Sequence, residues 1–335
     1  MKLKQIIALI TVAALIFISV AVNVVWSFVT TDFSTAMEEM QEEALASTGM
    51  KVIEKGDAMN RIAVLEVDGA IQDLGATGMF SSGYDHTFFM KQLQDIREDE
   101  SVKGIVLAVN SPGGGVLESA DIYDALIAIQ EEREIPIYVS MGGMAASGGY
   151  YISAPADKIF VNRETITGSI GVIMQALNYS ELAEKVGISF NTIKSGEFKD
   201  MMSPNRAMTD RERNLLQEML NDSYERFVEI IAEGREMSIA DVKKVADGRI
   251  MNGRQAIEAG LADDFGKREE VIEALKADFG LENAQVFSYS QNQGFASLFG
   301  LKMQQMLRPD FESQMVAKLL SDNGAPRMMY LYGEY

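Results

Sequence analysis

The amino-acid sequence predicts an α/β protein: a parallel sheet of βαβ units with a helical C-terminal part, preceded by an N-terminal transmembrane helix. Three observations predict this. Short apolar stretches alternate with amphipathic helical patterns between residues 61 and 199, which is typical of parallel strands covered by helices on both faces. After Lys199 the patterns are mostly helical. An apolar run at the start of the chain predicts the membrane helix.

The apolar N-terminal run has the length of a membrane anchor. Between Ile6 and Val29 the only strongly polar residue is Asn23, and at about 1.5 Å per helical residue this run covers a hydrocarbon core about 30 Å thick. Lys2 and Lys4 precede it, whereas acidic residues follow it. The positive-inside rule then predicts a single-pass protein of the cell membrane, with a cytoplasmic N-terminus and an extracytoplasmic body.

A cleaved signal peptide is the alternative interpretation of this segment. Ser19-Val20-Ala21 has the small residues of a signal peptidase site. The apolar run is long for a signal peptide and continues past that site, which favours an anchor that stays in place.

The folded elements are expected in a regular order. The first strand lies within residues 62–71, and the chain between residues 31 and 58 is acidic and weakly patterned, as in a linker or stalk. Further strands are expected at 103–111, 135–143, 157–162, 169–173 and 188–193, with one more short strand within 253–275. Helices are expected at 86–100, 116–134, 145–156, 209–236, 238–248 and on both sides of that last strand.

Helix start signals support the helical C-terminal part. Thr209 is an expected N-cap whose capping box is completed by Glu212, and Ser238 is the expected N-cap of the next helix. Residues 286–335 are rich in Gln, Met and Gly with weak patterning. We expect them to form a tail that serves oligomerisation or is partly disordered.

Composition excludes several classes of site. The 335 residues carry a net charge of −19, which argues against nucleic acid as a partner because phosphates demand a basic surface. The chain has no cysteine, so thiol nucleophiles, thiolate metal sites and disulfides are absent. It has one histidine, His86, so a Ser-His-Asp triad or a histidine metal site would have to use that residue.

Small and polar residues gather after three of the expected strands. They are Asn110 to Gly115 (NSPGGG), Met141 to Gly149 (MGGMAASGG) and Thr167 to Gly171 (TGSIG). Ligands of parallel sheets bind outside the carboxyl ends of the strands. We therefore expect these three stretches to lie at one edge of one sheet.

The glycine turn NSPGGG has three interpretations. It lacks the phosphate-binding motifs G-x-x-x-x-G-K-[ST] and G-x-G-x-x-G, which argues against a phosphate cradle. Its backbone N–H groups could instead stabilise the oxyanion of a tetrahedral acyl intermediate. The third interpretation is a tight connection between a strand and a helix, which glycines alone would also favour.

Ser147, the serine of the second stretch, needs a base to act as a nucleophile. His86 is a poor candidate, because it lies at the start of a helix where a solvated or capping role is expected. A lysine can serve when enclosure favours its neutral form. Lys199 lies beside Phe198, Met201 and Met202, which are expected to desolvate it, and Lys194 is the nearest competitor.

The chain resembles the signal peptide peptidase A family in its short, single-unit bacterial form. The resemblance rests on NSPGGG, the M-x-x-x-A-A-S-G-G-Y-Y run, the T-G-S-I-G-V run, and K-S-G-x-x-K-D followed by S-P. These four motifs occur in order and cover the chain from the N-terminal run to about Leu275. Each motif alone is weak, since ClpP-like proteins share a similar S-P-G-G turn.

The resemblance implies a ClpP/crotonase-like spiral of βαβ units in a peptidase domain over residues 59–285. It implies that Ser147 is the nucleophile and Lys199 the general base. It also implies that Gly114 donates to the oxyanion together with the Ser147 backbone N–H, and that Ser169 orients the lysine amine. The family degrades remnant signal peptides in the membrane with no metal or cofactor. Its half-length members form homo-oligomeric rings in which adjacent subunits share each active site.

Two other functions remain as alternatives. An acyl-CoA enzyme of the crotonase type would share the fold and an oxyanion hole, but it would need no Ser-Lys pair and no membrane anchor. An inactive, membrane-anchored ring scaffold would keep the fold without chemistry, although intact Ser147 and Lys199 argue against it.

Overall fold

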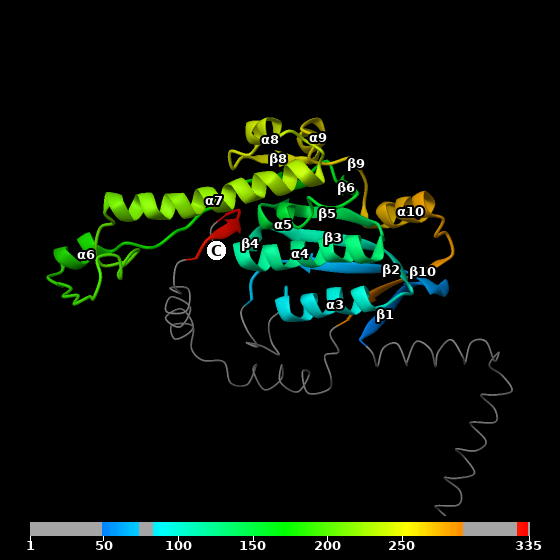
Figure 1. The fold of residues 1–335 in the computed structure, drawn as a ribbon, viewed down its shortest axis with the longest axis horizontal. Helices are drawn as coiled ribbons and strands as arrows, with labels where there is room; N and C mark the ends of the chain where they lie inside the picture. Colours follow the sequence, from blue (N-terminus) through cyan, green and yellow to red (C-terminus); the bar gives the residue numbers. More distant parts are fainter. Residues whose placement is uncertain (1–48, 74–82, 291–326, 334–335) are drawn as a thin grey trace, which may run out of the picture. The chain divides into compact units, whose positions relative to one another are not determined.

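The computed structural model describes residues 49–73, 83–290 and 327–333 (Figure 1). The chain divides into two compact units. Of the described residues, the smaller unit contains 49–52 and 289–290, where the Ser290 N–H donates to the Gly49 carbonyl at 2.6 Å. The larger unit contains residues 53–288 and 327–333. The predicted anchor, residues 1–30, lies outside the described residues. Among the described residues, no helix is long and apolar enough to span a bilayer.

The larger unit is built on a parallel sheet, as the sequence predicts. Its strand order is β10-β2-β3-β5-β6-β9, and each neighbouring pair is parallel. The strands are β2 (Asp57–Asp68), β3 (Val102–Ser111), β5 (Ile137–Ala146), β6 (Lys158–Val161), β9 (Asp264–Phe265) and β10 (Ala284–Tyr289). Two short strands extend one edge: β7 (Ile166–Gly168) runs parallel to the end of β5, and β8 (Ile250–Asn252) runs antiparallel to β7.

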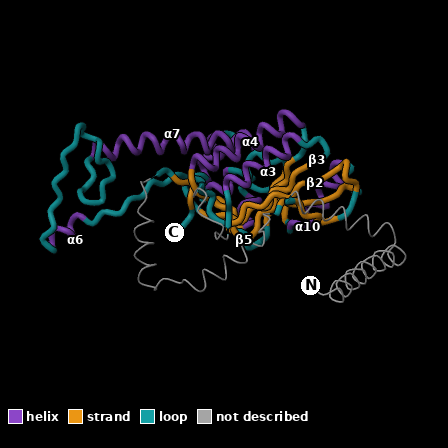
Figure 2. The backbone as a smooth tube through the Cα atoms, turned by 90° about the horizontal axis from the view of Figure 1, so that it is seen from below, coloured by secondary structure: helices purple, strands orange, loops and turns teal. Residues whose placement is uncertain are grey.

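Helices cover both faces of this sheet (Figures 1 and 2). The helices α3 (His86–Glu98) and α4 (Val116–Arg133) lie on one face, and α10 (Arg268–Phe279) lies on the other. In the α10 layer, Val271 and Leu275 pack in one cluster with Val64, Val106 and Val286 of the strands. Burial on both faces explains why the central strands read as continuous apolar runs.

The remaining helices follow the predicted order. They are α5 (Gly148–Tyr151), α7 (Asp210–Gly234), α8 (Ile239–Val245) and α9 (Gly253–Glu258), whereas α6 (Ser180–Lys185) was not predicted. The predicted caps are confirmed. The Thr209 hydroxyl accepts from the Glu212 N–H while the Glu212 carboxylate accepts from the Thr209 N–H, and Ser238 caps α8.

Several predicted elements are wrong. Residues 188–193 form no strand, because their period-2 pattern has no neighbouring strand to pair with and they are exposed. The strand predicted at 169–173 lies at 166–168 instead, since Gly168 and Ser169 have positive φ and end it. The helix predicted at 145–156 is only α5, because residues 145 and 146 still belong to β5.

The predicted stalk and tail also contain ordered strands. The strand β1 (Met50–Glu54) and the start of β2 fall inside the segment predicted as linker, residues 31–58. Most of β10 and all of β11 (Met329–Leu331) fall inside the predicted tail, residues 286–335. Both segments read as weakly patterned because their strands are short, and a short strand becomes evident only with its partner.

Candidate active site

Ser147 lies in a sharp turn between β5 and α5, with φ 52° and ψ −115°. This conformation costs free energy for a residue with a side chain, and such strain is concentrated at functional turns. The Ser147 N–H donates to the Gly168 carbonyl at 2.8 Å, and the Tyr151 N–H donates to the Ser147 carbonyl at 2.9 Å. A strained strand-to-helix turn of this kind presents a nucleophilic serine at the edge of a sheet.

The glycines after Ser147 are required by close packing against the glycine turn. A Cβ on Gly148 would lie 2.7 Å from the Ser119 Oγ and 3.1 Å from the Gly114 N. A Cβ on Gly149 would lie 2.9 Å from the Ser111 carbonyl oxygen. The small-residue run is therefore the contact surface between two turns, which brings two of the predicted stretches together.

The glycine turn forms β4 (Gly113–Gly115), a short strand with one edge held by the main body. The Ile71 N–H donates to the Gly113 carbonyl and the Gly115 N–H donates to the Ile71 carbonyl, both at 2.8 Å. Because alternate residues of a strand face opposite edges, the N–H and carbonyl of Gly114 point away from Ile71. The structure thus places Gly114 where the sequence predicts an oxyanion donor, next to the Ser147 turn.

The second predicted oxyanion donor, the Ser147 N–H, is already engaged in this conformation. The Ser147 N–H is occupied by the Gly168 carbonyl. Gly148 is the first residue of α5, so its N–H has no acceptor within the helix. A Cβ on Gly113 would lie 2.6 Å from the Gly148 N, and a Cβ on Gly148 would lie 3.1 Å from the Gly114 N, so these two backbone nitrogens lie close together.

An extended segment of the chain itself lies on the free edge of the glycine turn. The strand β11 pairs antiparallel with β4, with Tyr330 opposite Gly114. On its other edge, Met329 exchanges both backbone hydrogen bonds with Ile173, at 2.9 and 3.0 Å. A Cβ on Gly113 would lie 2.0 Å from the Tyr330 carbonyl oxygen. β11 therefore occupies a slot between two backbone edges, beside the candidate oxyanion donors.

The side chain of Tyr330 fills an aromatic pocket below this slot. Its ring centroid lies 4.8 Å from that of Tyr151 and 4.8 Å from that of Phe227, and its hydroxyl donates to the Ser223 carbonyl at 2.9 Å. Burial raises the pKa of the Tyr330 phenol well above its usual range, so this hydroxyl stays a hydrogen-bond donor. The slot thus binds a strand through its backbone and one large side chain through a pocket.

Ser169 follows the residue that holds the nucleophile turn. Its φ is 50°, it is largely buried, and its N–H donates to the Arg249 carbonyl at 2.7 Å. The preceding Gly168 accepts from the Ser147 N–H. The third predicted stretch therefore joins the other two at this edge of the sheet.

The structure does not bring Lys199 to Ser147. Lys199 is exposed, whereas Ser147 is only 1% exposed. Lys199 belongs to an arm, residues 174–208, that extends past the N-terminal end of α7 and away from α5 (Figure 1). The desolvation expected from Phe198 is wrong within this chain, because the Phe198 ring lies under the Arg211 guanidinium, 5.1 Å away.

The competing bases are engaged elsewhere. The Lys194 Nζ lies 2.6 Å from an Asp200 carboxylate oxygen and donates to the Glu197 carbonyl at 2.8 Å. The prediction of a solvated or capping His86 is wrong: Asp85 caps α3, and His86 is buried with its Nδ1 2.7 Å from the Tyr84 hydroxyl. Neither residue contacts the Ser147 turn.

An ionic cluster fixes the arm to the start of α7. The Arg206 guanidinium bonds to Asp200 at 2.6 and 2.9 Å and to both carboxylate oxygens of Glu212. These bonds hold the pKa of the Asp200 carboxyl well below its usual range and lower that of Glu212 to about 2. The end of the arm is therefore anchored, although much of its surface is exposed.

No group of three histidine, aspartate or glutamate side chains in the described ranges could hold a metal ion. The chemistry available at this edge of the sheet is that of a strained serine, backbone N–H donors and a slot for an extended peptide. That combination is typical of a serine peptidase.

Known proteins share this sequence pattern. Peptidase family S49 matches residues 129–282. The chain is 44% identical over 290 residues to the "Putative signal peptide peptidase SppA" of Enterococcus faecium, covering 84% of each chain. It is 40% identical to a "Putative protease" of Methanocaldococcus jannaschii, covering 65% of this chain and 69% of the relative. It is 34% identical to "Protease 4" of Haemophilus influenzae, covering 66% of this chain and 35% of that longer relative.

The fold and the comparisons define the chain as a serine peptidase. It belongs to peptidase family S49, in the short form that carries a single unit.

Proposed function

We propose that the protein is a membrane-anchored serine endopeptidase that uses Ser147 and Lys199 to degrade remnant signal peptides. The observation that carries the proposal is the slot occupied by β11. An extended segment is held there on both backbone edges, with its Tyr330 carbonyl beside the Gly113–Gly114 turn and the N-terminus of α5. Strand addition of this kind is how proteins bind peptides of varied sequence.

The proposed mechanism begins with a substrate strand in place of β11. The Ser147 hydroxyl attacks the substrate carbonyl carbon while the neutral amine of Lys199 takes the hydroxyl proton. The N–H groups of Gly114 and Gly148 donate to the oxyanion that forms. The lysine then returns the proton to the leaving amine, and water hydrolyses the acyl-enzyme by the same steps. Ser169, beside Gly168, orients the lysine amine.

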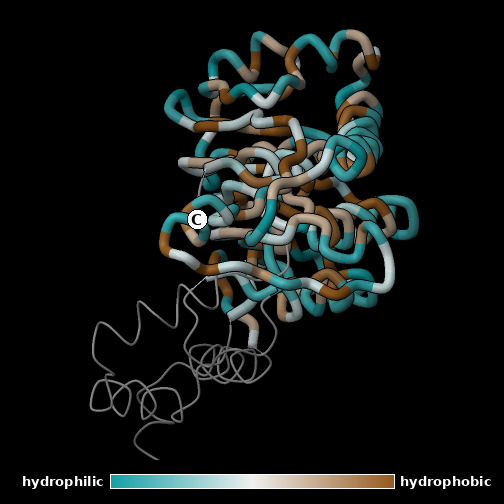
Figure 3. Tube along the Cα trace, turned by 90° about the vertical axis from the view of Figure 1, so that its left-hand side faces the viewer, coloured by the Kyte–Doolittle hydropathy of each residue, from teal (hydrophilic) through white to brown (hydrophobic). Residues whose placement is uncertain are grey.

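A second copy of the chain supplies the lysine in this proposal. Within one chain Lys199 is exposed on the arm and Ser147 is buried. Hydrophobic residues occur along the backbone of the arm (Figure 3), and several of them have large exposed side chains. They include Leu177, Leu182, Val186, Ile188, Phe190 and Ile193. Packing of the arm against a neighbouring subunit would bury this surface and enclose the lysine, which favours its neutral form.

The substrate and the membrane location rest on three further observations. The N-terminal 30 residues have the charge and apolar pattern of an anchor. The similar protein of Enterococcus faecium carries the name of a signal peptide peptidase. The pocket around Tyr330 is aromatic, and signal peptides are apolar. An extracytoplasmic peptidase held at the membrane would meet these peptides where they remain after secretion.

The decisive experiment is labelling of Ser147. The full chain in detergent is incubated with an active ester of a short apolar peptide acid, and the adduct is located by mass spectrometry. We expect one adduct on Ser147 in the wild type and none in the Lys199→Ala variant. Lys194→Ala is the matched control and should label normally. Absence of an adduct in folded, oligomeric wild type would favour the inactive scaffold.

A further inference from the structure

The strand that ends at Ser147 is interrupted three residues before the serine. Val109 of β3 pairs with Met141 of β5, but the next paired residues are Ser111 and Ala145. Asn110 therefore lies opposite three residues of β5, centred on Gly143. Bulges of this kind re-aim the strand that carries them and are common next to active sites.

The opposite edge of β5 is interrupted at the same place. β6 pairs with β5 up to Ser140, and β7 resumes the pairing at Met144. Within the bulge, residues Gly142–Met144, Gly142 and Gly143 therefore lie at gaps in both ladders, whereas Met144 already pairs with Ile166. The backbone groups of the bulge need partners that the sheet does not provide.

Side chains from both flanks supply those partners. The Asn110 Oδ1 accepts from the Met144 N–H at 3.2 Å, and the Thr165 hydroxyl donates to the Gly142 carbonyl at 2.7 Å. One residue pair further on, the Thr167 hydroxyl donates to the Ala145 carbonyl at 2.6 Å. We call Asn110, Thr165 and Thr167 the bulge clamp.

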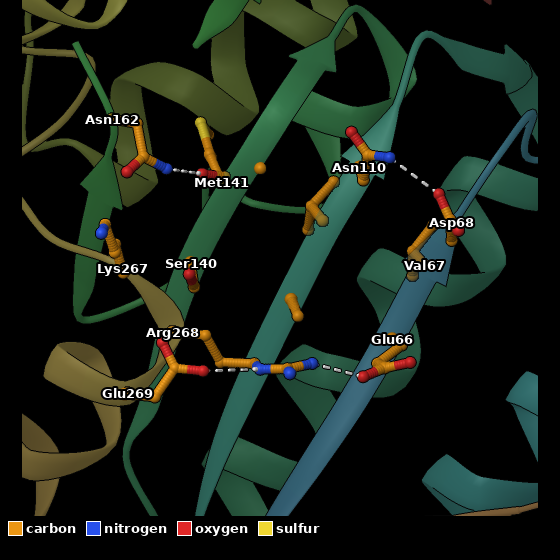
Figure 4. A pocket seen from close by; sticks show the side chains of 13 residues that line it. Glu66, Val67, Asp68, Asn110, Ser140, Met141, Asn162, Lys267, Arg268 and Glu269 are labelled. Carbon is orange, nitrogen blue, oxygen red and sulfur yellow. Dashed lines mark hydrogen bonds and ion pairs between the residues drawn. The ribbon is translucent and has the colours of Figure 1, made fainter. Parts of the chain in front are cut away.

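The clamp is itself held in place. The Asn110 amide donates to the Asp68 carboxylate at 2.8 Å, across a pocket of about 340 Å³ at the ends of β2, β3 and β5 (Figure 4). Thr165 is 0% exposed and its hydroxyl accepts from the Asn162 N–H at 2.9 Å. On the same flank, the Asn162 amide donates to the Met141 carbonyl at 3.1 Å.

We propose that the bulge clamp consists of positioning residues that set the direction in which β5 delivers Ser147 to the glycine turn. The inference rests on the proposed role of Ser147 as nucleophile. Ala145 and Ala146 are the only residues between the bulge and the serine, so the clamp acts on the strand close to Ser147. A displacement of about 1 Å at a reacting group can cost about 100-fold in rate.

The clamp differs from ordinary packing because solvent reaches part of it. Asn110 borders the pocket and is exposed, and Gly143 of the bulge is exposed as well. Water can therefore replace Asn110 as a partner of the Met144 N–H at little cost in stability. Loss of this contact should leave the end of β5 less firmly oriented without unfolding the sheet.

The first test uses the buried threonine. Thr165→Val keeps the shape of the side chain and removes the hydroxyl, whereas Thr165→Ser keeps the hydroxyl. With a short apolar peptide as substrate, we expect kcat to fall about 100-fold in Thr165→Val, with KM changed less than about twofold. Thr165→Ser should restore most of the activity. Equal activity of the two variants would overturn the proposal.

The second test uses the exposed flank and remains informative if Thr165→Val does not fold. Asn110→Asp places a carboxylate beside Asp68 and removes the donor between them, so the clamp should open. Adding Asp68→Asn reverses the donor and acceptor of the same hydrogen bond. The rate of Ser147 acylation by the peptide active ester should fall about tenfold or more in the single variant and recover to within about threefold in the double variant.

The pH dependence separates positioning from a general loss of structure. The groups that line the same pocket are Asp68, Glu66, Lys267, Arg268 and Glu269. Repulsion from Asp68 raises the pKa of a carboxyl introduced at position 110, and its protonated form donates to Asp68 as the amide does. The acylation rate of Asn110→Asp relative to wild type should therefore rise from about pH 8 to about pH 5. A constant ratio would contradict the proposal.

Glu66→Gln is the matched control, because Glu66 lines the same pocket on the same strand as Asp68 but forms its ion pair with the exposed Arg268. It should acylate as the wild type does. Wild-type labelling is measured in parallel. An unlabelled wild type would overturn the proposed function, whereas normal labelling of wild type and Asn110→Asp alike would overturn only the positioning role of the clamp.

Discussion

The two catalytic candidates lie in regions of opposite character. Ser147 is buried at the carboxyl edge of the sheet, where the glycine turn, α5 and the start of the 168–173 segment meet. Lys199 is exposed on an arm whose apolar side chains have little cover, and Ile193 is fully exposed at 102%. The chain therefore builds the strained half of the site from its own core. In the proposed assembly, the exposed surface of the arm packs against a second copy, which desolvates Lys199.

The backbone conformation of Ser147 costs conformational free energy. A non-glycine residue with φ 52° and ψ −115° is strained, and it persists only because the surrounding hydrogen bonds and close packing fix it. In the arm, Lys199 has no positive φ, although Met202 does, at 59°. The difference teaches that the Ser147 turn can be tested within a single chain, while the proposed role of Lys199 is tested in the proposed assembly.

The largest expected effect is at Ser147. Ser147→Ala and Ser147→Gly should both lower peptide cleavage by about 10⁴-fold or more, since each removes the nucleophile. Ser147→Gly should also raise the free energy of unfolding by about 1 kcal/mol, because glycine adopts this conformation with little strain. Kinetic assays of the two variants measure the loss of cleavage, and urea unfolding measures their free energies of unfolding. Equal stability of the alanine and glycine variants would contradict the strain.

The next effect is at Lys199, where the comparison makes a distinct prediction. Lys199→Ala should lower activity by about 10³-fold while leaving the melting temperature unchanged, because the residue is exposed. Mixing Ser147→Ala with Lys199→Ala chains should restore activity, since some sites then combine an intact serine with an intact lysine. Refolded mixtures are assayed against each variant alone. Mixed assemblies without any recovery would place both groups in one chain.

The arm surface should be more tolerant of substitution but decisive for assembly. Ile193→Asp places a charge on a fully exposed apolar position, so the isolated subunit should keep its stability. At the interface that charge would be desolvated, and activity per chain should fall about tenfold or more as assembly weakens. Sedimentation velocity measures assembly directly. Asn191→Asp, two residues away in the same arm, gives the matched charge change of −1 at an exposed polar position.

The strand β11 offers a smaller effect in the opposite direction. Tyr330→Ala removes the ring from the pocket of Tyr151 and Phe227 and should weaken occupation of the slot by the chain itself. Because an internal competitor lowers apparent affinity, KM for a short apolar peptide should fall about tenfold. The backbone of Tyr332 also bonds the glycine turn, and Tyr332→Ala is the control with unchanged KM. A higher KM in Tyr330→Ala would show that Tyr330 supports the site.

The smallest expected effect concerns the anchor of the arm. Arg206 lowers the pKa of Glu212 to about 2, so the stabilisation by the ion pair is complete above the unfolded value of about 4.3 and is lost as the pH falls towards 2. Glu212→Gln should therefore lower the melting temperature by about 2 °C at neutral pH. The difference should vanish near pH 2. Thermal unfolding followed by circular dichroism across this range provides the measurement, and a pH-independent difference would exclude the ion pair.

The sequence by itself determined the elements whose signals are local. Continuous apolar runs fixed the central strands, and the capping box at Thr209 fixed the start of α7. The glycine and serine motifs placed Ser147, Gly114 and Ser169 at one edge, because parallel strands end on the same side. Composition also left lysine as the general base to consider, since the chain has one histidine and no cysteine.

Only the tertiary structure decided the features that depend on partners distant in sequence. The alternating residues 188–193 form no strand because no neighbour pairs with them, whereas the short β11 forms one because the glycine turn does. The Ser147 N–H is occupied because β7 ends beside it at Gly168. The bulge at Gly142–Met144 follows from a register between strands. Hydrogen bonding and burial are properties of pairs of segments, and a pattern within one segment cannot specify its partner.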